Sequence, residues 1–304
     1  DRDRARMRVL AGAIVLVAAG ASGAPAAAQP RMLTRMFPAS RVLRPSLAAS
    51  LGDGEPLLGS EASAPADRTE AGPVECAMGE AFGTFVLGTL GFGVVCTATV
   101  AGMPMTLFDV AAIWGVGVAM GIWVSSGSSD GHLNPAVTLA MTLCRGFPRK
   151  RVAPHVLGQL MGATASAFFL TAAYWPLVLK MGRLPFQLAV MQGPSAFVSG
   201  MTCFVHEFWA TAVLAYAVLA IDDAPWKPAA VGAVVTGLIC VVAPLTGAGF
   251  NPARDLGPRI ASCLLSPFAP ALAGWGGWQA LPFTLGPTLG AIAGMAYFNF
   301  MRGL

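Results

Sequence analysis

Charged residues are scarce in this chain. They make up 11% of its 304 residues, whereas hydrophobic residues make up 55%. A soluble domain carries about 25% charged residues, so the composition argues for an integral membrane protein. The net charge is only +4, with the arginines spread among tails and loops. This pattern does not indicate nucleic-acid binding, and basic residues on the cytoplasmic side of a membrane explain it better.

Signatures of metal and disulfide chemistry are also missing. The six cysteines are scattered without a Cys-x-x-Cys pair, and most lie in apolar runs, where a free cysteine behaves as a small hydrophobic residue. His132 has no second histidine or carboxylate at metal-ligand spacing, so a structural role is its simpler interpretation. We therefore expect no metal site and no disulfide framework.

The first 72 residues do not have the composition of a folded core. Basic residues around Arg8 precede an apolar run at 9–21, which alone resembles a secretory signal peptide. No acidic residue occurs from Arg4 to Gly52 while arginines recur, which also fits an organellar transit segment. Proline, serine, glycine and charge then dominate up to Pro73, as in disordered segments. We expect residues 1–72 to be a disordered or targeting extension and residues 73–304 to be one membrane domain.

Six apolar segments come after Glu75, each close to the roughly 20 residues that a helix needs to cross about 30 Å of bilayer. We expect transmembrane helices at about 76–100, 107–123, 152–174, 197–221, 229–243 and 281–300. Four basic residues lie between the second and third spans, whereas the connection between the third and fourth has two. The positive-inside rule therefore places both termini in the cytoplasm, against the interpretation of a cleaved signal peptide.

The same tripeptide, Asn-Pro-Ala, occurs twice, and each copy comes after a glycine-bearing loop. Asparagine caps helices, and proline needs no N–H in a first helical turn, so each copy predicts a helix start. Each of the two segments that begin there is too short and too polar to cross a bilayer. A half-length helix entered through irregular backbone survives at membrane depth only where it lines a cavity. We expect two half-helices facing one pore, starting at Asn134-Pro135-Ala136 and Asn251-Pro252-Ala253.

The two halves of the membrane domain resemble each other. Glu80-Ala-Phe-Gly-Thr84 matches Glu207-Phe-Trp-Ala-Thr211, and each half also carries a Gly-x-x-x-Gly pair, at 158 and 162 and at 286 and 290. A repeat of three spans and one half-helix inverts in the membrane because three crossings is odd. The predicted fold is an all-α membrane protein with six transmembrane helices and two re-entrant half-helices in an inverted repeat, at about 75–175 and 197–302.

Glu80 and Glu207 are acidic residues well inside predicted spans, at matching repeat positions. Because a charge there is expensive, each needs a specific partner. Our preferred hypothesis is that each accepts backbone N–H groups from a re-entrant loop and braces the pore. Proton or ion coupling, as in a transporter, is the alternative.

Arg254 comes directly after the second Asn-Pro-Ala, so its guanidinium is expected at the pore constriction, donating to polar solutes and repelling cations. A helix-start arginine that reaches the lipid headgroups is the alternative. Asn134 and Asn251 would also donate to solute oxygens, and two helix N-termini would add positive potential. The expected pore-wall acceptors are backbone carbonyls, those of Gly131, His132, Leu133, Gly247, Ala248 and Gly249.

These motifs resemble the aquaporin (major intrinsic protein) family over residues 75–302. The residues that carry the resemblance are Trp114-Gly-Val-Gly-Val-Ala-Met120, Gly131-His-Leu-Asn-Pro-Ala-Val-Thr138, Leu245-Thr-Gly and Asn251-Pro-Ala-Arg-Asp-Leu-Gly-Pro-Arg259. Asp255, Arg259 and Trp114 resemble the glycerol-conducting branch.

By position, the resemblance implies a selectivity filter of Trp114, Ile239, Ala248 and Arg254. That set is more similar to plant nodulin-like intrinsic proteins, since glycerol facilitators tend to have Gly and Phe at the two middle positions. The spacing between the two asparagines, 251 − 134 = 117, is shorter than usual for the glycerol branch, and Phe283-Thr284 stands where that branch usually has Pro-Leu.

The resemblance implies a passive channel, not an enzyme, with no cofactor. Glycerol and water are the favoured cargo: Trp114 would offer an apolar face to the carbon edge of a solute while Arg254 binds its hydroxyls. It also implies a homotetramer, in the plasma membrane or an organellar one. Alternatives are a water-selective channel or a nodulin-like channel for metalloid acids, ammonia or urea. Less favoured are a proton-coupled transporter and a non-conducting membrane scaffold.

Overall fold

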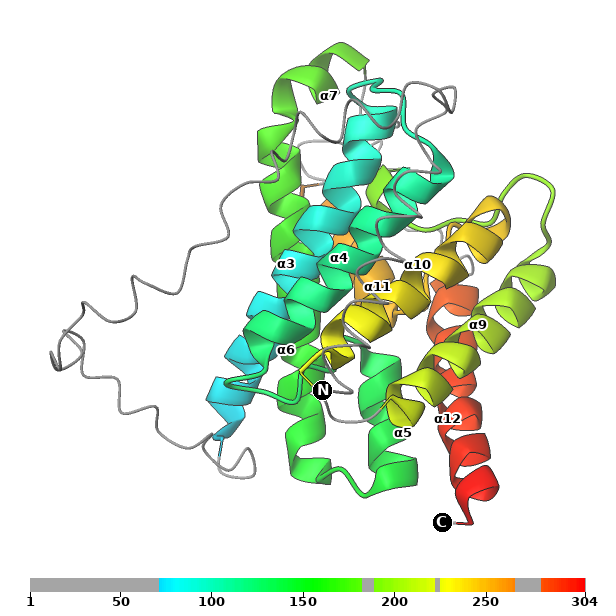
Figure 1. Ribbon diagram of the computed structural model, residues 1–304. Coiled ribbons are helices and arrows are strands. Elements are labelled where there is room, and N and C mark those ends of the chain that lie inside the picture. The colour runs from blue at the N-terminus through cyan, green and yellow to red at the C-terminus, as the bar shows by residue number, and fades with distance from the viewer. Residues whose placement is uncertain (1–70, 182–188, 222–224, 266–279, 304) are drawn as a thin grey trace, which may run out of the picture. The chain divides into compact units, whose positions relative to one another are not determined.

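The computed structural model describes residues 71–181, 189–221, 225–265 and 280–303. Within these ranges every regular element is a helix (Figure 1). Apart from its last two residues, the predicted N-terminal extension lies outside the described residues.

Six long helices run side by side, and each is long and apolar enough to cross a membrane. This confirms the predicted six-span all-α fold and an integral membrane protein. The long helices are α3 (Pro73–Thr99), α4 (Leu107–Ser125), α6 (Arg149–Ala173), α9 (Gly200–Ala220), α10 (Lys227–Thr246) and α12 (Leu281–Arg302).

Two differences from the predicted boundaries have a local explanation in the first turn of the helix. Helix α9 begins at Gly200 instead of 197 because the Ser199 side chain accepts the N–H of Thr202 (3.1 Å) and caps it. Helix α10 begins two residues early, with Pro228 in its first turn. A short helix, α7 (Trp175–Met181), comes after α6 and was not predicted.

Two shorter helices begin at the two Asn-Pro-Ala sequences, as the sequence predicts. They are α5 (Pro135–Arg145) and α11 (Pro252–Leu265). At about 1.5 Å per residue, neither reaches across a bilayer. The last turn of α5 lies at the end of the bundle where α3 begins and α12 ends (Figure 1).

Glycines allow α3 to pack closely on α6, and α9 on α12. A methyl group at Gly158 or Gly162 would overlap the carbonyls of Ala77 or Ala81 on α3. In the other half, Gly290 lies in the same way against the carbonyl of Phe208. Helices in lipid have no hydrophobic driving force to associate. Small residues at such contacts let the backbones approach closely, so that van der Waals packing holds the helices together.

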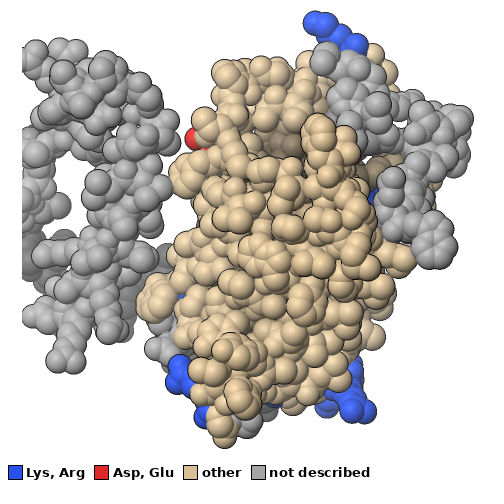
Figure 2. Space-filling view, turned by 90° about the vertical axis from the view of Figure 1, so that its right-hand side faces the viewer, with Lys and Arg blue, Asp and Glu red and all other residues tan. Residues whose placement is uncertain are grey.

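The surface carries most of its exposed basic residues at one end. Figure 2 shows Lys and Arg side chains gathered at the lower end of the molecule and a further group at its upper end, whereas the middle of the visible face is almost entirely free of charge. Arg145, Arg149, Lys150 and Arg302 are exposed near the ends of α5 and α12 and the start of α6. An apolar belt with basic residues at one edge is the surface expected of a membrane-spanning bundle.

Candidate functional site

The two half-helices meet through their asparagines, which bind each other's loops. Asn134 caps α5, its Oδ1 accepting the N–H of Ala136 (2.9 Å), and its Nδ2 donates to the carbonyl of Phe250 (2.8 Å). Asn251 likewise caps α11 through the N–H of Ala253 (2.9 Å) and donates to the carbonyl of Leu133 (2.7 Å). One N–H of each amide therefore holds the opposite loop. A primary amide has two, so each asparagine keeps a second N–H for another acceptor.

The loops before the half-helices adopt strained backbone at matching places. Leu133 (φ 52°), Phe250 (φ 54°) and Ala248 (φ 59°) lie in the left-handed region, which non-glycine residues rarely adopt. Such conformations cost on the order of 1–3 kcal/mol each and persist only where the surroundings enforce them.

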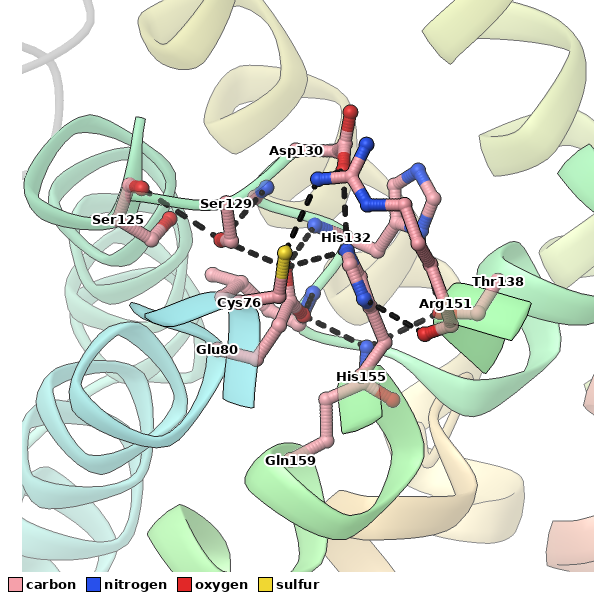
Figure 3. Close-up of polar contacts among 12 residues, drawn as sticks. Cys76, Glu80, Ser125, Ser129, Asp130, His132, Thr138, Arg151, His155 and Gln159 are labelled. Atoms are coloured by element: carbon pink, nitrogen blue, oxygen red, sulfur yellow. Dashed lines mark hydrogen bonds and ion pairs between the residues drawn. The ribbon is translucent and has the colours of Figure 1, made fainter. Parts of the chain in front are cut away.

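Glu80 holds the backbone of the first loop in this conformation. Its carboxylate is fully buried and accepts the backbone N–H of His132 (2.9 Å) and of Leu133 (2.7 Å). The hydroxyl of Ser129 (2.9 Å) and the amide of Gln159 (2.6 Å) complete its shell (Figure 3).

Glu207 does the same for the second loop. It is fully buried and accepts the N–H of Gly249 (2.9 Å), the N–H of Phe250 (2.7 Å) and the hydroxyl of Thr246 (2.6 Å). Each carboxylate thus accepts two backbone N–H groups from the loop it faces, in addition to side-chain donors. The chain arranges them symmetrically, one for each half-helix.

The first loop has an additional charged cluster that was not predicted from the sequence. Asp130 Oδ2 lies 2.9 Å from Arg151 Nη2 and 3.0 Å from His155 Nε2 (Figure 3). His155 Nδ1 faces the Arg151 carbonyl (2.9 Å), and Arg151 donates to the sulfur of Cys76 (3.1 Å). Both neighbours of the His155 ring are acceptors, so both contacts are hydrogen bonds only when the ring carries a proton on each nitrogen. The signal available in the sequence was an acidic residue next to the loop and a run of basic residues at the start of α6.

The charges in this cluster determine the titration of Asp130. Burial by itself would raise the pKa of its carboxyl, but the hydrogen bond from His155 and the positive charges nearby outweigh burial. The net result is a pKa below the usual value for aspartate.

The four predicted filter residues come together although they belong to α4, α10, α11 and a loop. Trp114, Ile239, Ala248 and Arg254 are all buried and all line a cavity of about 1000 Å³. The cavity also passes both asparagines and His132 and extends to Arg145 and Lys227 at the basic end. It therefore runs along the bundle past the meeting point of the half-helices.

Arg254 lies over the Trp114 ring, with its guanidinium carbon 4.4 Å from the ring centroid. Gly91 lies against the same ring, so close that a methyl group there would overlap it. Gly91 and the Arg254 guanidinium thus both lie against the Trp114 ring, which lines the cavity. No local pattern indicates this arrangement, because the position of an arginine side chain depends on distant contacts.

Other predicted residues lie beside the cavity or behind its wall. Gly131, His132, Leu133 and Gly249 line it, and so does Phe250, which was not selected from the sequence. Asp255 instead accepts a hydrogen bond from Nε of Arg259 (2.8 Å), four residues further along α11. Among the described residues, no three His, Cys, Asp or Glu side chains are placed to hold a metal ion.

Comparisons with known proteins agree with this architecture. The family profile described as major intrinsic protein matches residues 69–298. A glycerol uptake facilitator protein of Haemophilus influenzae is 32% identical over 246 residues, which cover 71% of this chain and 89% of that protein. An aquaporin of Laccaria bicolor is 34% identical over 243 residues, covering 74% of this chain and 90% of the relative. The solved aquaglyceroporin of Plasmodium falciparum superposes with a TM-score of 0.68 at 24% identity, covering 75% of this chain and 96% of that one.

Proposed function

The chain belongs to the major intrinsic protein family, and on that premise we propose that it is a passive channel for small neutral solutes, glycerol and water foremost. One observation supports this most: two capped half-helices meet inside a cavity that Arg254 also lines. Relatives that are named as glycerol uptake facilitators support glycerol as cargo.

Solutes would be selected by their charge and by their pattern of hydrogen-bonding groups. The N-termini of α5 and α11 point positive partial charge at the middle of the cavity, and Arg254 adds a full charge. Cations and protons are therefore penalised there. A polyol can accept from the free amide N–H of Asn134 and Asn251 and donate to the carbonyls of the two loops. In the filter, its carbon edge would lie against Ile239, Ala248 and Trp114.

A proton-coupled transporter is less well supported by the geometry. Coupling requires a carboxylate that can release its partners when it is protonated. Glu80 and Glu207 instead hold strained loops through short bonds to backbone N–H groups. We assign them to bracing the pore. The proposed channel needs neither a cofactor nor covalent chemistry.

We place the basic end of the bundle, and with it both termini, in the cytoplasm. The plasma membrane is the proposed location, with an organellar membrane as the alternative that the N-terminal extension leaves open. By analogy with the family we propose a homotetramer with one pore in each subunit.

Stopped-flow light scattering on proteoliposomes tests the function directly. We expect glycerol and water to equilibrate faster than across protein-free liposomes of the same lipid, and a transmembrane pH gradient to leave glycerol flux unchanged. Flux that saturates and varies with the pH gradient would instead identify a coupled transporter. Flux equal to that of protein-free liposomes would identify a scaffold.

A further inference from the structure

The segment before α9 is held against the filter by a pair of charged residues on α11. The backbone N–H of Gln192 donates to Asp255 Oδ1 (3.1 Å), and its carbonyl accepts from Arg259 Nη2 (2.6 Å). Asp255 and Arg259 also bind each other (2.8 Å). Both backbone groups of Gln192 are thus fixed by one buried ion pair. Its own side chain is left to reach the filter, and the residue is only 8% exposed.

The Gln192 amide has one orientation that satisfies its surroundings. With its oxygen towards Arg254, it accepts from Nη1 and from Nη2 (2.7 Å), and its nitrogen donates to the carbonyl of Gly247 (3.0 Å). The opposite orientation places donors against donors and the amide oxygen against a carbonyl. Gln192 therefore connects Arg254 to the loop that contains Ala248.

The other contacts of the guanidinium are aromatic. Arg254 lies over Trp114, and its guanidinium carbon is 5.5 Å from the ring centroid of Phe92. Phe92 packs edge-on against Trp114, with ring centroids 5.4 Å apart at 84°. Aromatic faces attract the cation but leave its rotation about the stacking axis weakly defined. Two hydrogen bonds to one amide oxygen define that rotation.

We propose that Gln192 is a positioning residue for solute selection: it fixes the orientation of the Arg254 guanidinium and occupies one N–H on each terminal nitrogen. This leaves the second N–H of each nitrogen for solute hydroxyls. The proposal rests on the proposed channel function, and it gives the Asp255–Arg259 pair a role, which is to hold Gln192 in place.

Losing Gln192 should affect a polyol more than water. A solute with two hydroxyls needs both guanidinium donors in a set geometry, and preorganisation favours that contact. Water requires only one contact at a time. Introducing a carboxylate at the same place should act differently, because it would neutralise the charge of Arg254 and lower the barrier to cations.

The experiment compares Gln192→Ala and Gln192→Glu with the wild type in proteoliposomes. Met191→Leu serves as the matched control, since Met191 is the chain neighbour and packs against the hydrophobic core. For Gln192→Ala we expect the glycerol-to-water permeability ratio to fall by roughly threefold to tenfold, as expected for loss of a charge-assisted contact. For Gln192→Glu we expect methylammonium leak to rise by about tenfold at neutral pH, and to subside at a pH that protonates the new carboxyl.

Two flux results would overturn the proposal. One is a glycerol-to-water permeability ratio and a cation leak that, in both variants, lie within twofold of the values for Met191→Leu. The other is a proportional loss of glycerol and water flux in both variants without cation leak, which is what a purely structural role would give. If the Ala variant does not fold, the nearly isosteric Glu variant decides the matter.

Solid-state NMR of arginine labelled with nitrogen-15 separates this proposal from the channel function. In the wild type, slow rotation of the Arg254 guanidinium should give resolved Nη signals, and these should merge in Gln192→Ala. Unmerged signals would refute the positioning role. Merged signals in a protein that does not conduct would uphold that role while the proposed function fails.

Discussion

Arg254 and Ala248 set two properties of the narrow part of the cavity, its charge and its width. Both are buried, and both line the cavity near Trp114. Ala248 is a small residue at a place where a larger side chain would project towards the filter. Changes at the two positions should therefore produce different defects.

Replacing Ala248 with Phe should reduce glycerol flux more than water flux. The ring would fill space beside Trp114, and water needs less width than a triol. Parallel stopped-flow measurements with glycerol and water gradients check this, with total protein matched between preparations. An unchanged glycerol-to-water ratio would mean that Ala248 does not belong to the filter.

Replacing Arg254 with Val should raise the leak of protons or cations. The variant removes the fixed charge from the cavity while Asn134, Asn251 and the two helix N-termini remain, so the leak should be partial. Decay of a pH gradient across proteoliposomes measures it, with Ala248→Phe as the comparison that keeps the charge. A leak no greater than the wild type's would show that the helix termini alone exclude cations.

Asp130 should make the stability of the folded protein depend on pH in the acid range. Its pKa is lowered in the folded protein, so it contributes stability that is present above its unfolded pKa of about 3.9. That contribution is lost as the pH falls through the lower, folded pKa. Asp130→Asn should therefore flatten the loss of thermal stability between about pH 5 and pH 2. Thermal unfolding in detergent tests this against Glu75→Gln at the exposed start of α3, and equal slopes for both variants would contradict it.

At the level of elements, the half-helices depend on carboxylates that lie far away in the sequence. Glu207→Ala would leave the N–H groups of Gly249 and Phe250 and the hydroxyl of Thr246 without their acceptor. Each unsatisfied buried group costs roughly 1–3 kcal/mol. Folding yield and the unfolding midpoint should fall before selectivity changes. Glu207→Gln, which keeps one acceptor oxygen, should be milder.

The outcome that would contradict this prediction is specific. A Glu207→Ala protein that folds with normal yield and loses only proton-coupled uptake would support a transporter instead of a braced channel.

The starts of α5 and α11 could be predicted because their signal is local. An asparagine cap and a first-turn proline act within a few residues, so the sequence near Asn134 and Asn251 is sufficient. Gln192 could not be predicted in the same way. Its backbone partners lie 63 and 67 residues further along the chain. No periodicity or turn rule connects such positions, and the same holds for the contact between Asp130 and Arg151.

At the scale of the molecule, the pairing of two similar halves was visible in the sequence, but their asymmetry was not. Glu80 and Glu207 occupy matching places and make matching contacts. The cluster of Asp130, Arg151 and His155 reinforces the first loop. This asymmetry comes from individual side chains that are present in the first half only. A comparison of the repeated motifs does not reveal it.

The membrane domain should conduct without the preceding residues. Both repeats lie between Pro73 and Arg302, and the composition of residues 1–72 is unsuited to a buried core. A chain shortened to begin at Pro73 should assemble and pass glycerol at the wild-type rate once it is in a membrane. Flux per inserted molecule, measured beside the full chain, checks this. Loss of flux in correctly inserted shortened protein would assign a conducting role to the extension.

The reciprocal asparagine bonds have a consequence for the order of events during synthesis. Asn134 finds its acceptor at Phe250, 116 residues later in the chain. A ribosome adds roughly 5–20 residues per second, so the first half must wait on the order of ten seconds for its partner. During that interval the α5 loop has Glu80 to hold its backbone but no opposite loop to bind. The polar backbone of the first half therefore has to be covered by other groups in the insertion machinery during this time. The hydrogen bonds at the centre of the pore form only after the residues around Phe250 have been synthesised.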